Sequence, residues 1–359
     1  MTTPLSRTVE ATPAPGPRTA VVRRAGVSLR FRVRTLVTAV VVAAVALALA
    51  ILALCLGDFA LTPAQVAGAL LGVDGGFTAT VVREWRLPRV LAALVFGAAL
   101  GISGAVFQSL TRNPLASPDV IGLSAGSYAG GLSVILLLGA SAGSIAVAGG
   151  AIVGGLVAAA LVYALAYRRG IQGFRLIVVG IGVSAMLQAL STYLLLRAKI
   201  EVAMVAAVWG AGSLTPVGWA QFIPTVGVVV VACAALVGFS GALSRLELGD
   251  DAARALGVRV ERSRLGLVVC AVALTAAVTA AAGPIAFVAL AAPQIARRLA
   301  RTAGIALVPS ALVGAVVLLA SDVVAQHVLP TPLPVGLVTV VVGGLYLVWL
   351  LVHETRRRA

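Results

Sequence analysis

Long apolar stretches separated by short polar segments run through the chain from residue 35 to residue 353. An apolar helix needs about 20 residues to cross a bilayer. One span each is predicted for the charge-free stretches 35–56, 90–111, 176–196 and 302–321. The stretch 120–167 is long enough for two spans with a turn at 139–144, and 202–244 contains one near 217–240. The stretch 265–296 is broken by Gly283-Pro284, and 323–353 ends in a last span near 334–353.

This pattern gives nine clear spans and a short, ambiguous one at 285–301. Lysine and arginine are enriched in cytoplasmic loops, and ten spans place 22 of the 27 basic residues on the side of the N-terminus. We therefore predict an all-α polytopic membrane protein with ten transmembrane helices and both termini in the cytoplasm. Residues 1–34 are predicted to be a disordered basic tail, 35–353 the transmembrane domain, and 354–359 a second basic tail.

Composition excludes a soluble protein. Hydrophobic residues make up 60% of the chain, charged residues 11%, and the mean hydropathy is +1.08, whereas soluble domains have about 45–50% apolar and about 25% charged residues. The net charge of +15 would otherwise indicate a nucleic-acid partner. Because the basic residues flank the spans, they orient the chain in a lipid bilayer, and no nucleic-acid partner is expected.

Sequence motifs for catalysis and cofactor binding do not fit their required contexts. The string GIGVSA at 180–185 lies inside a span, where small residues favour helix packing. The single lysine, Lys199, follows Ala198, so the chain has no Gly-Lys phosphate loop. We expect no catalytic residue, no metal site and no directly bound cofactor. Asp322 is an acid within an apolar stretch, which leaves two interpretations open: structural pairing or transport chemistry.

Two cytoplasmic loops carry most of the remaining polar information. The first, RNPLASPD, predicts a tight turn built from Arg112, Asn113, Pro114, Pro118 and Asp119. Its two prolines break helix, and Asp119 is placed to cap the next span.

The second loop, 241–264, holds nine charged residues. Within it, DDAARALG predicts a short helix with acids in its first turn and Gly257 as its stop. This helix would present Ala252, Ala253, Ala255 and Leu256 on a compact surface. From the residues alone, a plain loop and a docking element for a cytoplasmic partner remain equally good interpretations.

A series of motifs carries a family resemblance. LPR (87–89), GAALGISGAVFQSLTRNPLASPD (97–119), WGAGSL (209–214), LGDDAARALGV (248–258) and GPIAFVALAAPQIARR (283–298) occur in this order. The series resembles the FecCD permease family of ABC importers for iron-siderophores, haem and cobalamin, over about residues 35–353.

The resemblance implies a transport subunit rather than an enzyme. It implies a second permease subunit around a shared path, cytoplasmic ATPase subunits that use ATP, and an extracytoplasmic substrate-binding lipoprotein. It also implies that the segment matching LGDDAARALGV docks on the ATPase. On this basis the expected coupling residues are Gly249, Asp250, Asp251, Ala253, Leu256 and Gly257.

Some positions depart from the common family pattern. Gln294 follows Pro293 where a histidine is frequent, and 332–336 reads PLPVG without the frequent acid. These features are closer to the ferric-enterobactin-type branch, whose permeases often work as unlike pairs, so a paralogous heterodimer is favoured over a homodimer. The leading expectation is a permease that imports a ferric siderophore. An ion-driven secondary transporter and a membrane enzyme or receptor are the alternatives, and the residues that bind substrate are not identified.

Overall fold

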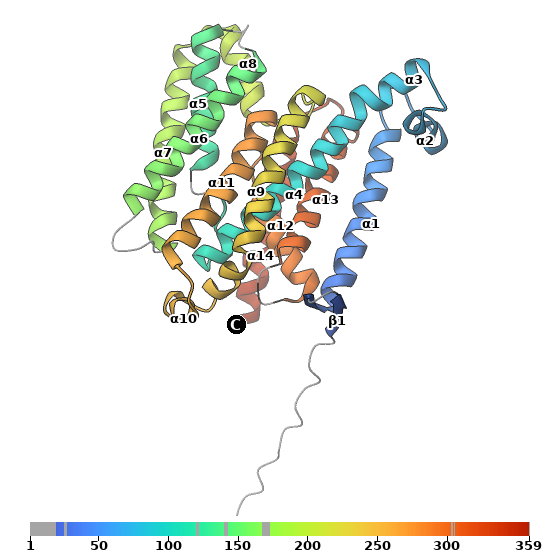
Figure 1. The fold of residues 1–359 in the computed structure, drawn as a ribbon. Coiled ribbons are helices and arrows are strands. Elements are labelled where there is room, and N and C mark those ends of the chain that lie inside the picture. The colour runs from blue at the N-terminus through green and yellow to red at the C-terminus, as the bar shows by residue number, and fades with distance from the viewer. Residues whose placement is uncertain are drawn as a thin grey trace, which may run out of the picture.

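The computed structural model describes residues 19–24, 27–119, 122–139, 143–166, 173–302, 304 and 306–358. Helices dominate this part of the chain (Figure 1). Those that match the ten expected spans are α1 (Val33–Cys55), α4 (Leu87–Thr111), α5 (Leu123–Leu138), α6 (Ser144–Ala166), α7 (Gly173–Arg197), α9 (Trp219–Leu246), α11 (Val260–Ala282), α12 (Val288–Ala300), α13 (Leu307–His327) and α14 (Val335–Arg358).

Length and hydropathy separate these helices into two groups. Among the described residues, seven helices are long and apolar enough to cross a membrane, and α5 and α14 contribute shorter apolar stretches. The helix α12, which corresponds to the eighth predicted span, has 13 residues, and most of them are buried in the protein. A helix too short to span alone is tolerated where protein surrounds it. The predicted ten-helix architecture is therefore confirmed, including its short eighth member.

The remaining short elements lie at the two ends of the helical body. The connection between α1 and α4 contains α2 (Pro63–Leu71), α3 (Gly76–Thr80) and the π-helical turn η1 (Val81–Arg86), while α8 (Ile200–Gly210) precedes α9. Figure 1 places α3 and α8 at one end, and α10 (Asp250–Ala255), β1 and the C-terminus at the other. The second end is the one that the arginine distribution predicts to be cytoplasmic.

Small residues bring three helices into close contact at the centre. A side chain added at Gly97 or Gly101 of α4 would collide with the backbone of α13, at Gly314 and Ser310 respectively. At Gly104 it would collide with the backbone oxygen of Ala289 in α12. Small residues are how membrane helices approach at backbone distance. The result is that α4 is largely buried between α12 and α13.

An ion pair closes the outer end of the α4–α13 contact. The Arg89 guanidinium donates to both carboxylate oxygens of Asp322, with Nε–Oδ2 at 2.9 Å and Nη2–Oδ1 at 2.7 Å. Asp322 is 5% exposed. Of the two interpretations of Asp322, structural pairing is the one that the structure supports.

Two other arginines fasten the outer connection. Arg86 donates to the backbone oxygens of Leu54 and Phe59, at 2.8 and 2.6 Å, and Arg83 donates to the oxygen of Ala69 at 2.7 Å. Carbonyls in the last turn of a helix have no partner within the helix. Arg86 and Arg83 therefore supply donors to the last-turn carbonyls of α1 and α2, and Gly72 with left-handed backbone ends α2.

The described part of the N-terminal tail, for which disorder is predicted, contains two short strands. Strands β1 (Thr19–Arg24) and β2 (Val27–Arg32) pair antiparallel, with Thr19 opposite Arg32. Valine and phenylalanine in these segments favour extended backbone. The prediction of disorder rests instead on the Pro- and Thr-rich start of the tail. The C-terminal arginines continue α14 to Arg358. Residues 1–18 and 359 lie outside the described residues.

Candidate functional site around α10

The predicted docking segment forms one short element, α10, between two glycines with left-handed backbone. Gly249 precedes it with φ of 115°, and Gly257 follows it with φ of 79°. The amide of Gly257 donates to the oxygen of Arg254, and that of Val258 donates to the oxygen of Ala253. This pair of bonds closes a helix at a glycine. The predicted short helix and its stop at Gly257 are confirmed.

Exposure divides the expected docking residues into two sets. The Asp251 side chain is fully exposed, Leu256 is 53% exposed, and Gly257 is exposed. Ala253 is completely buried and belongs to the main hydrophobic core. The prediction that Ala253 is presented on the surface is wrong, because α10 needs one side to pack on the membrane helices. Ala253 anchors the helix, and Leu256 is its exposed apolar residue.

Asp250 is directed mainly toward the protein rather than toward solvent. Arg264 of α11 donates to both of its carboxylate oxygens at 2.9 Å, and Arg112 donates to Oδ1 at 3.1 Å. The Arg264 side chain is 7% exposed. Arg112 also donates to the backbone oxygen of Leu246 at the end of α9. The acid at the start of α10 therefore joins this helix to α11 and to the turn after α4.

The turn 112–119 has the tight geometry that its sequence predicts. Arg112 adopts left-handed backbone with φ of 50° and ends α4. The Asn113 side-chain oxygen accepts from the amide of Leu115 at 2.9 Å, a side-chain interaction typical of asparagine in turns. The backbone oxygen of Pro118 accepts from the amide of Leu123 at 3.2 Å, where α5 begins.

Asp119 does not cap α5 as predicted. The N-cap residue is Gly122, with φ of 94° and no side-chain hydrogen bond. Asp119 instead accepts from the Ser124 hydroxyl at 2.6 Å, and its Oδ2 has no partner among the described residues. Burial raises the pKa of Asp119 to about 6, although hydrogen bonds from Ser124 and the Phe287 backbone favour the carboxylate. The left-handed glycine explains the missed cap, because it turns the chain into the helix without side-chain help.

A buried amide network links this turn to α12. The Gln108 Oε1 accepts from Gln294 at 2.9 Å and from Arg297 at 3.0 Å. Gln294 also donates to the backbone oxygen of Pro114 at 2.7 Å, and Gln108 donates to that of Leu290. Sequence reasoning noted Gln294 only as a family departure and did not identify Gln108. The available signal was an amide within the apolar run GAVFQSL.

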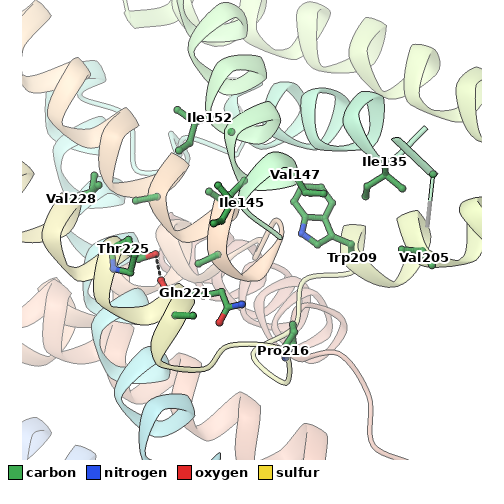
Figure 2. A pocket seen from close by; sticks show the side chains of 18 residues that line it. Ile135, Ile145, Val147, Ile152, Val205, Trp209, Pro216, Gln221, Thr225 and Val228 are labelled. Carbon is green, nitrogen blue, oxygen red and sulfur yellow. Dashed lines mark hydrogen bonds between the residues drawn. The ribbon is translucent and has the colours of Figure 1, made fainter. Parts of the chain in front are cut away.

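A large apolar cavity lies between α9 and α11 on one side and α5, α6 and α8 on the other (Figure 2). Its volume is about 640 Å³. No charged residue is among those that line it, and the Thr225 hydroxyl donates to the Gln221 backbone at 2.8 Å. The cavity therefore offers mainly apolar contact and no charge to a ligand.

Comparison with known proteins gives the family of the chain. The profile of the FecCD transport family matches residues 45–353. The ferric enterobactin transport system permease protein FepG of Escherichia coli K12 is 51% identical over 303 residues, which cover 84% of this chain and 91% of that protein. The iron(3+)-hydroxamate import system permease protein FhuG of Bacillus subtilis 168 is 36% identical, covering 84% and 92% of the two chains.

A solved structure agrees at the level of the fold. An inward-facing conformation of a putative metal-chelate type ABC transporter superposes with a TM-score of 0.77 and 26% sequence identity. The match covers 89% of this chain and 99% of that one. With a family match over most of its length, the multi-pass membrane protein described above is a member of the FecCD transport family.

Proposed function

We propose that this chain is the permease subunit of an ATP-driven importer that carries a ferric siderophore into the cytoplasm. FecCD permeases are parts of ABC importers, and the relative with 51% identity over 303 residues is named for ferric enterobactin transport. A separate ATPase uses the ATP, because this chain has no Gly-Lys phosphate loop. The chain is thus a transport component rather than an enzyme, with no cofactor of its own.

The observation that carries the mechanism is the two-sided construction of α10. Its inner side is held by Ala253 in the core and by Asp250 against Arg264. Its outer side presents Asp251 and Leu256. A fixed helix with an exposed apolar residue transmits force from a docked partner into α11 and α4. Gly249, Asp250, Asp251, Ala253, Leu256 and Gly257 are therefore proposed as the ATPase-coupling residues.

The remaining partners follow from exposed apolar surface and topology. Large apolar residues on α7 and α14 are exposed, among them Ile181, Met186, Leu345 and Val348. We propose that part of this surface meets a second permease subunit, with a paralogous partner favoured over a second copy, and that the rest faces lipid. The substrate arrives from an extracytoplasmic binding lipoprotein. The chain resides in the bacterial plasma membrane with both termini in the cytoplasm.

The test is uptake of radiolabelled ferric enterobactin by a strain in which this gene is deleted and then supplied on a plasmid. The wild-type chain restores ATP-dependent uptake. Leu256→Glu lowers uptake about tenfold or more, because a buried interface residue is worth about 2 kcal/mol or more. Leu256→Met is the matched control and retains uptake.

Membrane abundance of each variant is measured in the same cells. Uptake that persists without ATP but requires an ion gradient would contradict the proposed mechanism. Normal uptake by Leu256→Glu would contradict the docking assignment.

A further inference from the structure

Two cavities follow one another along the contact between α9 and α11, and together they are called the α9–α11 groove. The cavity at the cytoplasmic end has a volume of about 360 Å³ and lies beside α10. The lining residues that matter here are three arginines and one aromatic ring: Arg245, Arg259, Arg262 and Phe239.

These arginines differ from the other two in the segment 241–264. Arg254 pairs with Asp251 at 2.8 Å, and Arg264 pairs with Asp250 at 2.9 Å. Arg245, Arg259 and Arg262 are exposed, and in the part of the chain that the structure describes none has a carboxylate oxygen within 4.0 Å. The loop therefore satisfies two arginines internally and gathers three uncompensated positive charges around one cavity.

The nearest acid does not neutralise this cavity. Glu261 lies between Arg259 and Arg262 in sequence, but its Oε1 is directed to Arg264 at 3.9 Å. The guanidinium of Arg245 donates to the backbone oxygen of Leu256 at 3.4 Å, across the mouth of the cavity. Guanidinium groups retain free donors in such an arrangement and bind phosphate oxygens well.

The cavity farther along the α9–α11 contact is apolar. This second cavity has a volume of about 490 Å³ and begins one helical turn from Phe239, and its lining includes Val231, Ala235, Val269 and Ala273. It shares Pro224 and Val228 with the apolar cavity of Figure 2. Because α9 and α11 both span the membrane, this upper part of the groove lies at the depth of acyl chains, while the arginines lie at the cytoplasmic boundary.

We propose that the α9–α11 groove is a binding site for an anionic phospholipid of the cytoplasmic leaflet. Its phosphate lies among Arg245, Arg259 and Arg262, and an acyl chain lies along Val231, Ala235 and Val269. Basic pockets between membrane helices on the cytoplasmic side bind such head groups. The apolar continuation distinguishes a lipid from free phosphate or an acidic peptide, which would fill only the charged end.

The site has a consequence for the neighbouring helix. Arg245 bridges the end of α9 to the carbonyl of Leu256, which is the C-cap of α10. A phosphate that holds Arg245 in place also fixes the end of α10. This inference stands apart from the transported substrate, since it requires only that the chain spans a membrane in the predicted orientation.

The probe is phosphatidylglycerol, with phosphatidylcholine as the zwitterionic reference. The full-length chain is reconstituted in nanodiscs that contain equal amounts of the two lipids, and lipids retained after extraction are counted by native mass spectrometry. We expect phosphatidylglycerol to be retained preferentially. Each juxtamembrane arginine is worth about fivefold in affinity, so R259Q/R262Q should lower retention roughly 25-fold.

Two matched variants separate charge from groove. R254Q removes an arginine of the same loop outside the cavity, and we expect retention to be unchanged. A235W fills the apolar part and should lower retention with all three arginines present. The apparent Tm of each variant in lipid-free detergent is measured to verify folding, and it should equal that of the wild type because all four positions are exposed.

Competition assigns the source of the phosphate. Excess inorganic phosphate should leave phosphatidylglycerol bound, and its complete release would overturn the lipid assignment in favour of a free anion. Equal retention of both lipids, or unchanged retention by R259Q/R262Q, would also overturn it. Release of phosphatidylglycerol when the ATPase assembles on the chain would show that a protein, rather than a lipid, occupies the arginine cavity.

Discussion

One guanidinium nitrogen of Arg264, Nη2, donates to both carboxylate oxygens of Asp250, each at 2.9 Å. The arginine belongs to a membrane helix and is almost completely buried, whereas the aspartate begins the exposed helix α10. The pair therefore joins the surface helix α10 to the transmembrane body. Its neighbour Asp251 has the same chemistry but pairs only with Arg254, at the surface.

This difference predicts that substitutions at the two adjacent aspartates have unequal effects on the free energy of unfolding. Asp250→Asn leaves the buried Arg264 without its main counter-charge, and we expect a loss of about 2–3 kcal/mol, less than for a fully buried pair because Asp250 is partly exposed. Asp251→Asn should leave the free energy of unfolding unchanged. Thermal unfolding of the two purified variants checks this, and equal stability of the two variants would refute the inward orientation of Asp250.

The Arg89–Asp322 pair at the outer end of α4 and α13 gives a second prediction. Asp322→Leu leaves Arg89 unpaired and should cost about 3–5 kcal/mol, whereas Arg89→Leu with Asp322→Leu should recover most of that loss. The apparent Tm in detergent measures both, and ferric siderophore uptake is recorded in parallel. A stable double variant without uptake would instead assign Asp322 to transport chemistry.

Close helix packing predicts a contrast between two glycines. Gly104→Ala places a methyl group against the backbone oxygen of Ala289, and we expect a loss of about 1–3 kcal/mol. Gly227→Ala meets no atom within 4 Å and should be neutral or slightly stabilising, since alanine favours helix. Thermal unfolding distinguishes them, and a tolerated Gly104→Ala would mean that α4 and α12 lie further apart.

Asp119 predicts a pH dependence of stability. Its pKa is raised to about 6 in the folded protein, against about 3.9 in an unfolded chain. The neutral acid is therefore favoured by folding, and its contribution is full below about pH 4 and lost as the pH rises through about 6. The difference in free energy of unfolding between Asp119→Asn and the wild type should therefore shift in favour of the variant by roughly 1–3 kcal/mol between pH 5 and pH 8.

A second variant concerns the Ser124 hydroxyl, which favours the charged form of Asp119. Ser124→Ala removes the donor to Asp119, so the pKa should rise further and the loss of stability should extend to higher pH. Unfolding measured between pH 4 and pH 9 tests both variants. A wild type and Asp119→Asn with parallel profiles would show that Asp119 keeps its ordinary pKa.

The sequence predicts those parts of the fold that depend on local apolar length. Charge-free stretches locate the ten helices, including short α12, because a helix that crosses a bilayer must be apolar over about 20 residues. They do not predict α2, α3 or the hairpin β1–β2. The helix α2 has local signals, namely Pro63 at its start, a capping box of Thr62 and Gln65, and Gly72 as its C-cap. It is too short to register in a search for apolar stretches of spanning length.

The candidate site divides in the same way. The acids, alanines and Gly257 predict α10 locally, and the structure confirms it. The inward orientation of Asp250 depends on Arg112, which is 138 positions away, and the burial of Ala253 depends on the helices beneath it. The Gln108–Gln294 bond joins positions 186 apart. Such tertiary partners leave no periodic signal in a single sequence.

The most direct test of the account is site-specific photo-crosslinking from α10 in the assembled transporter. A photoreactive amino acid replaces Leu256 in one variant and Asp250 in another, both in the full chain in native membranes. The account predicts that position 256 captures the ATPase subunit and that position 250 captures none, because position 250 lies on the side of α10 that faces Arg264 and the membrane helices. Capture of the ATPase from position 250 but not from 256 would contradict it.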